Sequence, residues 1–214
     1  MYIPPHFDER RIELMHDLIR ARPLATLVTV SRRGLNANHL PFQLIPGEGA
    51  FGTLRGHIAR SNPLWQELDG GVEALAVFHG PEGYVSPSWY PTKRDDGKVI
   101  PTWNYVVVHA HGTLHVVDDE AWLRVHLQTL TDAHEAAFSE PWAMTDAPGD
   151  YIDRLVAKVV GIEMVVARLE GKWKLSQNQA EPNRVGVVQG LEKRGGERAL
   201  ELAALVGEDR NDGP

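Results

Sequence analysis

The sequence predicts a mainly β, α+β protein, in which an antiparallel meander closes wholly or partly into a barrel and helices lie at its periphery and C-terminus. Three observations support this fold class. Turn residues separate β-rich runs between residues 24 and 58. Strands resume between residues 72 and 117 with short connections. The last third has mostly helical spacing. Because 214 residues allow one substantial core, we expect a single domain, residues 1–214, with a helical extension at about 180–210.

The chain is expected to begin with an extended segment and one helix. Two prolines favour extended backbone over Met1–Phe7. Asp8 is the expected N-cap of the helix, and Pro23 ends it. The apolar face of this helix is formed by Ile12, Met15, Leu18 and Ile19.

The meander follows as predicted strands at residues 24–31, 35–45 and 50–58, with turns at 32–34 and 46–49. A short helix then begins at Pro63, capped by Ser61 or Asn62, and ends near Gly70. Further strands are expected at residues 72–79, 84–90 and 102–117.

The C-terminal part is expected to be mostly helical. Asp118 or Asp119 caps a helix, and a second helix spans about 150–160. The first of these helices carries the apolar residues Trp122, Val125, Leu127 and Leu130. One more strand covers 161–175, with a turn or bulge at 170–171. The tail from residue 181 reads as two short helices divided at 195–196, and residues 210–214 should be frayed.

Composition and missing motifs exclude several functional classes. Without cysteine, there are no disulfides, thiol nucleophiles, Fe–S clusters or cysteine-ligated zinc. The net charge of −7 opposes contact with nucleic acid. No secretion signal and no apolar run of membrane-spanning length is found, so we expect a cytoplasmic protein. No G-x-G-x-x-G motif stands between a predicted strand and a helix, and the Walker A and G-x-S-x-G motifs are absent, which disfavours Rossmann dehydrogenases, P-loop NTPases and α/β-hydrolases.

Two segments rich in aromatic and polar residues, 84–90 and 101–105, are the most informative part of the chain. Tryptophan and tyrosine need partners for their N–H and O–H groups, so such clusters on facing strands indicate a planar ligand with polar edges, such as a flavin. An aromatic cross-strand cluster in the core is the alternative. The polar and aromatic candidates are Ser86, Ser88, Trp89, Thr102, Trp103 and Asn104.

A second candidate region, residues 55–63, ends a strand and opens a helix. Free backbone N–H groups, the Arg60 guanidinium and the Ser61 hydroxyl together suit a phosphate monoester. An ordinary N-cap beside a surface arginine is the alternative.

Polar residues also gather at two other strands. Lys172, Lys174 and Ser176 should share one strand face, followed by the amides of Gln177 and Asn178, which can bond ring carbonyls or ribityl hydroxyls. A solvated strand end is the alternative. The pair 38–39 lies in an apolar strand, where a buried histidine satisfied by a neighbour is the common explanation.

Together these segments resemble the PaiB-type FMN-binding negative transcriptional regulators over nearly the whole chain. The matching motifs are residues 1–7, 39–41, 56–63, 84–90, 101–105 and 174–178. The resemblance implies a split β-barrel related in fold to pyridoxamine-phosphate oxidases, FMN as cofactor, a homodimer with FMN at the subunit interface, and repression of sporulation and degradative-enzyme genes. Gln179 departs from the family, which usually carries arginine there. The alternative function is an FMN-dependent oxidoreductase that acts on a small molecule without DNA.

The resemblance also implies a set of cofactor-binding residues. Arg60 and Ser61 would hold the phosphate, with His57 and Asn62 close by. The residues between 86 and 104 would line the isoalloxazine and ribityl region, and Lys174, Gln177 and Asn178 would reach across the dimer. The full set is His39, His57, Arg60, Ser61, Asn62, Ser86, Ser88, Trp89, Thr102, Trp103, Asn104, Lys174, Gln177 and Asn178.

Three histidines raise the separate question of a metal. His109, His111 and His115 fall on one face of a strand, with the first two about 6.6 Å apart at the usual rise per residue. Gly112 can introduce a bulge, and no acidic residue completes the set locally. Solvent-facing or dimer-contact histidines are therefore expected, rather than metal ligands.

The predicted C-terminal helix pair imitates a helix-turn-helix, but its charges oppose DNA. The second helix carries Glu197, Glu201, Glu208 and Asp209 against Arg198 and Arg210. Such carboxylates would face phosphate, so we expect weak direct DNA binding at most. A basic dimer face would favour DNA binding, but the candidates for one are scattered, such as the basic pairs at 10–11, 32–33 and 93–94.

Overall fold

The computed structural model describes residues 1–31, 34–68, 70–95 and 97–208, and it divides the chain into two compact units. Unit 1 comprises Met1–Arg11, His79–Val108 and Glu170–Pro214. Unit 2 comprises Ile12–Phe78 and His109–Leu169. Three long strands, β6 (Val72–Val85), β7 (Thr102–Val117) and β8 (Val159–Lys174), contribute residues to both. The expectation of a single domain stays a prediction.

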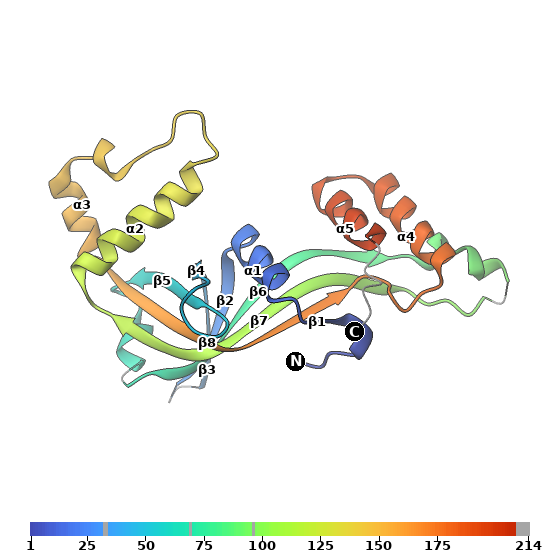
Figure 1. Ribbon diagram of the computed structural model, residues 1–214, viewed down its shortest axis with the longest axis horizontal. Coiled ribbons are helices and arrows are strands. Elements are labelled where there is room, and N and C mark those ends of the chain that lie inside the picture. Colours follow the sequence, from blue (N-terminus) through green and yellow to red (C-terminus); the bar gives the residue numbers. More distant parts are fainter. Residues whose placement is uncertain (32–33, 69, 96, 209–214) are drawn as a thin grey trace. The chain divides into compact units, whose positions relative to one another are not determined.

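The described strands form one eight-stranded sheet in the order β3-β2-β6-β7-β8-β5-β4, with β1 paired to β8 (Figure 1). The remaining strands are β1 (Asp8–Glu9), β2 (Leu24–Ser31), β3 (Gly34–Pro41), β4 (Gln43–Ile45) and β5 (Thr53–Ala59). Alternate residues of β2, such as Ala25 and Leu27, are fully buried, which is the period expected of a strand with one face on a core. The mainly β prediction is confirmed.

Unit 2 contains the helices α1 (Ile12–Ala21), η2 (Pro63–Glu67), α2 (Glu120–Glu135), η5 (Met144–Asp146) and α3 (Gly149–Val156). Met15 and Ile19 on the predicted face of α1 are buried. The prediction of Asp8 as its N-cap is wrong, because Asp8 lies in β1 opposite Lys172. At α2, Asp119 is the N-cap, and its carboxylate accepts from the backbone N–H of Trp122.

Unit 1 contains η1 (Pro5–Phe7), η3 (Pro87–Trp89), η4 (Pro91–Arg94), α4 (Glu181–Arg194) and α5 (Glu197–Gly207). The helices α4 and α5 pack side by side, and α4 also contacts η3 and η4 (Figure 1). Gly195 and Gly196, both with positive φ, form the predicted division between them. Within the described residues, no helix is both long and apolar enough to span a membrane.

Several predicted boundaries differ from the structure for local reasons. Residues 84–90 are not a strand, because β6 runs on to Val85 and Pro87 opens a 3-10 turn. A 3-10 turn at Pro5–Phe7 likewise interrupts the extended N-terminus. The predicted strand 35–45 is divided at Phe42, whose N–H bonds to the Pro23 carbonyl.

The last strand has no turn at 170–171, since Gly171 pairs with Glu9 of β1. The helix expected at 150–160 ends at Val156, and β8 begins at Val159. The predicted turn residues 32–33 and the tail 210–214 lie outside the described residues.

Candidate functional site

The strand-to-helix junction of unit 2 connects β5 to η2. Asn62 caps η2 as predicted, because its Oδ1 accepts from the Leu64 N–H at 3.0 Å. Its Nδ2 donates to Asn38 Oδ1 at 2.8 Å. The Asn62 amide thus ties η2 to β3 and is already engaged on both ends. Ser61 is exposed, and within the described part of the chain its hydroxyl has no partner.

Arg60 is held in place by a carboxylate at this junction. Its guanidinium donates to both Asp118 oxygens, at 3.1 and 2.5 Å, and to the carbonyls of Ala157 and Val159. The guanidinium also lies 5.7 Å from the centroid of the Trp65 ring. Its hydrogen bond holds the pKa of the Asp118 carboxyl below the ordinary value. Four of the five N–H donors are therefore used, and the positive charge is neutralised.

A histidine pair, buried at His126 and half-buried at His57, joins β5 to α2 in the same unit. His57 Nδ1 lies 3.2 Å from His126 Nε2, and the His126 ring stacks on Trp122 with centroids 5.0 Å apart. A Cβ on Gly161 would approach the Trp122 ring to 2.5 Å, so glycine is required beneath it. His126 is 3 % exposed, and its Nδ1 has no partner among the described residues.

Both imidazoles of this pair are biased toward the neutral form. Burial, reinforced by His57 and Arg55, lowers the pKa of His126 to about 4. Burial also lowers the pKa of His57. His57 was predicted near the phosphate, but as a neutral ring at neutral pH it would add no charge there. His126 could not be identified from the sequence, since an inward-facing histidine has no distinctive spacing on an amphipathic helix.

Two aromatic residues of unit 1 are exposed. Tyr84 and Trp103 are 41 % and 53 % exposed and meet edge to face at 6.2 Å. The alternative of a core cluster is therefore wrong for these two, although Tyr90 is buried. Exposed aromatic faces remain available to a planar ligand or to a second protein chain.

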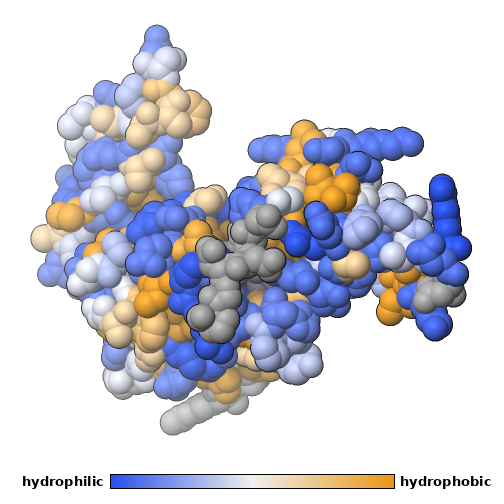
Figure 2. Space-filling model, turned by 45° about the vertical axis from the view of Figure 1, so that its right-hand side comes forward, coloured by the Kyte–Doolittle hydropathy of each residue, from blue (hydrophilic) through white to orange (hydrophobic). Residues whose placement is uncertain are grey.

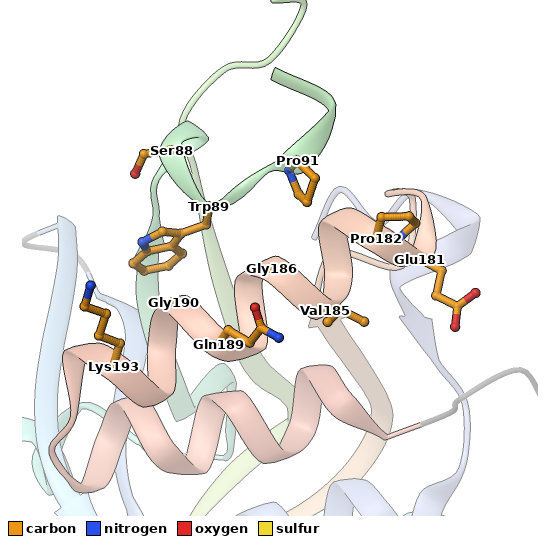
Figure 3. A pocket seen from close by; sticks show the side chains of 10 residues that line it. All are labelled: Ser88, Trp89, Pro91, Glu181, Pro182, Val185, Gly186, Gln189, Gly190 and Lys193. Carbon is orange, nitrogen blue, oxygen red and sulfur yellow. The ribbon is translucent and has the colours of Figure 1, made fainter. Parts of the chain in front are cut away.

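Trp89 packs on α4 instead of facing a neighbouring strand. A Cβ on Gly190 would overlap its ring, and one on Gly186 would overlap its carbonyl. Figure 3 shows the indole lying over the helix at Gly190, with Lys193 beside it. The adjoining open pocket has a volume of about 740 Å³. Nearby, the hydroxyls of Ser86 and Ser88 are 2.7 Å apart.

The side-chain amides of unit 1 that were predicted to bind the cofactor form hydrogen bonds largely within the protein. Asn104 is 1 % exposed and donates to Ser176 Oγ at 2.9 Å. Ser176 lies beyond β8 with φ 65°, a conformation that costs energy in a non-glycine residue. Gln177 donates to the Trp173 carbonyl and accepts from the Leu175 N–H. Asn178, in contrast, is exposed.

Lys174 and Thr102 are brought together in unit 1, where the lysine ammonium donates to the threonine hydroxyl at 2.7 Å. In unit 2, His39 is exposed on β3, so the interpretation of a buried histidine is wrong.

The histidines of β7 share one face, as predicted from their even spacing. His109 and His111 have ring centroids 6.2 Å apart, and Arg168 lies 3.0 Å from His111 Nδ1. His115 is exposed farther along the strand. Among the described residues, His109 and His111 belong to a group of potential metal ligands, and His115 is not part of it.

Comparisons with known proteins place this chain among flavin-binding proteins. An uncharacterized protein of Emericella nidulans is 32 % identical over 243 residues, covering 97 % of each chain. The "Protease synthase and sporulation protein PAI 2" of Bacillus subtilis is 27 % identical over 206 residues, covering 96 % of each. The flavocytochrome Anf3 of Azotobacter vinelandii has a TM-score of 0.58 at 12 % identity, covering 86 % of this chain and 78 % of that one.

The "FAD and Heme binding protein" of Mycobacterium smegmatis has a TM-score of 0.55 at 18 % identity, covering 88 % of this chain and 79 % of that one. The split β-barrel prediction is confirmed. The family model described as "Putative FMN-binding domain" matches residues 1–168. The chain therefore belongs to this FMN-binding family, as the resemblance in its sequence predicted, and its cofactor is FMN.

Proposed function

We propose that this chain is a homodimeric FMN-binding protein of PaiB type, that the β5–η2 junction holds the cofactor phosphate, and that any regulatory role operates without direct DNA reading. When bound, FMN supplies hydride or electron chemistry that no side chain provides. The chain's own task is to bind and orient that group.

The phosphate assignment depends on one observation, the convergence of the Arg60 guanidinium and the free Ser61 hydroxyl at one junction. Asp118 now occupies the guanidinium, but Arg60 and Asp118 are 37 % and 49 % exposed. Exposed ion pairs contribute little to stability, so replacing the Asp118 carboxylate by another anion at the Arg60 guanidinium costs little free energy. A phosphate monoester carries more negative charge than one carboxylate and offers three acceptor oxygens. The donor set therefore fits the group.

Paired titrations with FMN and riboflavin, which lacks the phosphate, test this assignment. Arg60→Ala removes a charge-assisted contact and should weaken FMN roughly tenfold to a hundredfold while leaving riboflavin unchanged. Asp118→Asn breaks the same ion pair, so it serves as the structural control and should keep or strengthen FMN binding. Equal weakening of both flavins by Arg60→Ala would show that the arginine is only structural. Loss of FMN in Asp118→Asn would lead to the same conclusion.

The proposal of a homodimer follows from the family resemblance and agrees with the exposed aromatic residues of unit 1. Tyr84 and Trp103 are unusual side chains to leave in water. On the face drawn in Figure 2, hydrophobic and hydrophilic areas are interspersed, so that face alone does not mark an interface. Sedimentation and flavin fluorescence, measured over one dilution series, should change together. Flavin retained by a clear monomer would exclude a shared site.

The absence of direct DNA reading is supported by the α4–α5 hairpin. Leu202, Ala203 and Val206 of α5 are buried, so its other side faces outward. Glu197, Arg198 and Glu208 are exposed there, giving an acidic balance among the described residues. The predicted charges at 209 and 210 lie outside the described residues.

The basic pair at 10–11 adds no free positive charge, because Arg10 and Arg11 are paired with Asp8 and Glu9. A groove-reading helix needs the opposite charge, so a regulatory role would operate through a protein partner or a metabolite. The sporulation-related name of the Bacillus subtilis relative supports that role.

The second candidate function is an FMN-dependent oxidoreductase that acts on a small molecule. The acidic outer side of α5 favours it, because such an enzyme needs no DNA. The redox nature of the flavocytochrome with this fold is compatible with it. Rapid reduction of the bound flavin by a nicotinamide nucleotide, followed by reoxidation with a small acceptor, would support this function. Flavin that neither donor nor acceptor changes would support regulation alone.

A further inference from the structure

Two lysines of β8 flank one tyrosine ring in unit 1. The Lys172 and Lys174 ammonium groups lie 5.3 and 5.9 Å from the centroid of the Tyr105 ring. Lys172 also lies 5.7 Å from the ring of Tyr2 and donates to its carbonyl at 3.1 Å. Cation–π contacts of this length orient ammonium groups on an aromatic face. The lysine stems are thereby fixed rather than left free in solvent.

Strand geometry explains why the two lysines converge. Residues two apart on a strand point to the same face, and Trp173 between them is buried on the other. Their Cα atoms are therefore about 6.6 Å apart. The strands β1, β8 and β7 are neighbours in the sheet (Figure 1), and this brings Tyr105 to the same place.

Each nearby carboxylate already has its own cation. Asp8 stands opposite Lys172 in the ladder, but its carboxylate bonds to Arg10 at 2.7 Å. The Glu170 carboxylate lies 2.9 Å from the amino group of Met1. No carboxylate lies within ion-pair distance of Lys172 or Lys174 among the described residues. The two lysines therefore leave a local excess of two positive charges.

The hydrogen bonds of the ammonium groups are also incomplete. Each ammonium has three N–H donors. Lys172 uses one on the Tyr2 carbonyl, and Lys174 uses one on the Thr102 hydroxyl. Both side chains are half-buried, so an oxyanion would meet charges that water screens only in part. Two ammonium groups beside the same aromatic ring match a group with several acceptor oxygens.

We propose that Lys172, Lys174 and Tyr105 form an anion-binding site for a phosphate monoester or a carboxylate. Lys174 belongs to the resemblance-based set of cofactor residues, whereas Lys172 and Tyr105 do not. The site does not depend on the phosphate assignment at Arg60. Its anion has one of two sources. It is a separate anionic substrate or effector, or it is the single phosphate of FMN, which would then bind here instead of at Arg60.

Calorimetric titration with inorganic phosphate at fixed ionic strength tests the site, using flavin-free and FMN-loaded protein. Flavin-free protein should bind phosphate saturably, and the double change Lys172→Met and Lys174→Met should weaken that binding at least tenfold. Tyr105→Phe should keep it and Tyr105→Leu should weaken it, since only the second removes the aromatic face. Lys93→Met, at an exposed lysine of the same unit, is the matched control and should have no effect.

The FMN-loaded protein distinguishes the two sources. Phosphate binding that persists identifies a separate anionic ligand, whereas binding that disappears identifies the cofactor phosphate as the occupant. The proposal is overturned if flavin-free protein shows no saturable binding, or if the double lysine variant binds as well as the parent. Binding lost in Arg60→Ala but kept in the double lysine variant would also overturn it, and would leave the Arg60 assignment standing.

Discussion

Acid should weaken the protein through the contacting histidines His57 and His126, and removing His126 should remove most of that effect. The His126 pKa falls from an ordinary 6.5 to about 4 in the folded chain. Between these two values the unfolded chain binds a proton that the folded chain does not. The free energy of unfolding must therefore decrease as pH falls through this window.

The expected size follows from the same two pKa values. The contribution of His126 is nearly complete at pH 7 and should lower the free energy of unfolding by about 2 kcal/mol on going to pH 5. His57 should add to this in the same direction, since burial lowers its pKa as well. The neighbouring Arg55 is paired with Glu48 and Glu163, so no free carboxylate among these neighbours compensates the new charge.

Urea unfolding at pH 7 and pH 5 gives the change in the free energy of unfolding between the two pH values. Comparing this change in the parent and in His126→Leu isolates the contribution of His126. Contributions of all other groups, and of bound flavin, are largely common to both proteins. The variant should lose about 2 kcal/mol less than the parent between pH 7 and pH 5. His126→Asn provides a second variant if leucine folds poorly, and His134→Gln, at an exposed histidine of α2, is the control. Equal pH dependence in the parent and His126→Leu would refute the reasoning.

Two further predictions concern the packing of Trp89 on α4 and the affinity of the protein for DNA. Gly190→Ala should lower the free energy of unfolding by about 1–3 kcal/mol and shift Trp89 fluorescence, because the new methyl overlaps the indole. Gly149→Ala, with open space around its Cβ, should be neutral or stabilising, and an equal loss in both would reject the packing argument. The FMN-loaded protein should bind its own upstream DNA with a Kd no tighter than about 10⁻⁴–10⁻⁶ M at physiological salt. Nanomolar affinity that survives unrelated competitor DNA would reveal a basic surface that the described residues do not show.

Regular strands were predictable where a run rich in apolar and β-branched residues continues without glycine or proline at its centre or ends at a clear turn signal. The prediction for β7 matches its observed bounds, and β2 does as well. The continuation of β6 beyond His79 was missed, because Gly80, Pro81 and Gly83 have the composition of a turn. Gly83 has a different reason to be there, since a Cβ would approach Leu202 of α5 to 2.8 Å. Only the tertiary structure provides that reason.

The phase of α2 was predictable only in part. Val125, expected on the apolar face, is 67 % exposed, while Leu123 and His126 are buried. Apolar residues occur on more than one side of this helix, so their spacing does not fix which side faces the sheet. Stacking on Trp122 and the contact with His57 select the observed phase.

The candidate site, too, was predictable from the sequence only in part. The segment containing Arg60 and Ser61 was identified from its residue types at a strand-to-helix junction. Its partner Asp118 is 58 positions away and could not be assigned from one sequence. The amides of Asn104 and Gln177 look like ligand groups in the sequence, yet they bond within the protein. Residue type alone does not reveal which polar groups the fold has already satisfied.

Whether this chain binds FMN is best measured by the visible spectrum of the purified protein, with its flavin extracted and identified. We expect flavin absorption bands, an extracted cofactor that is FMN, and uptake of one FMN per chain by flavin-free protein. A colourless protein that takes up no FMN on titration would contradict it.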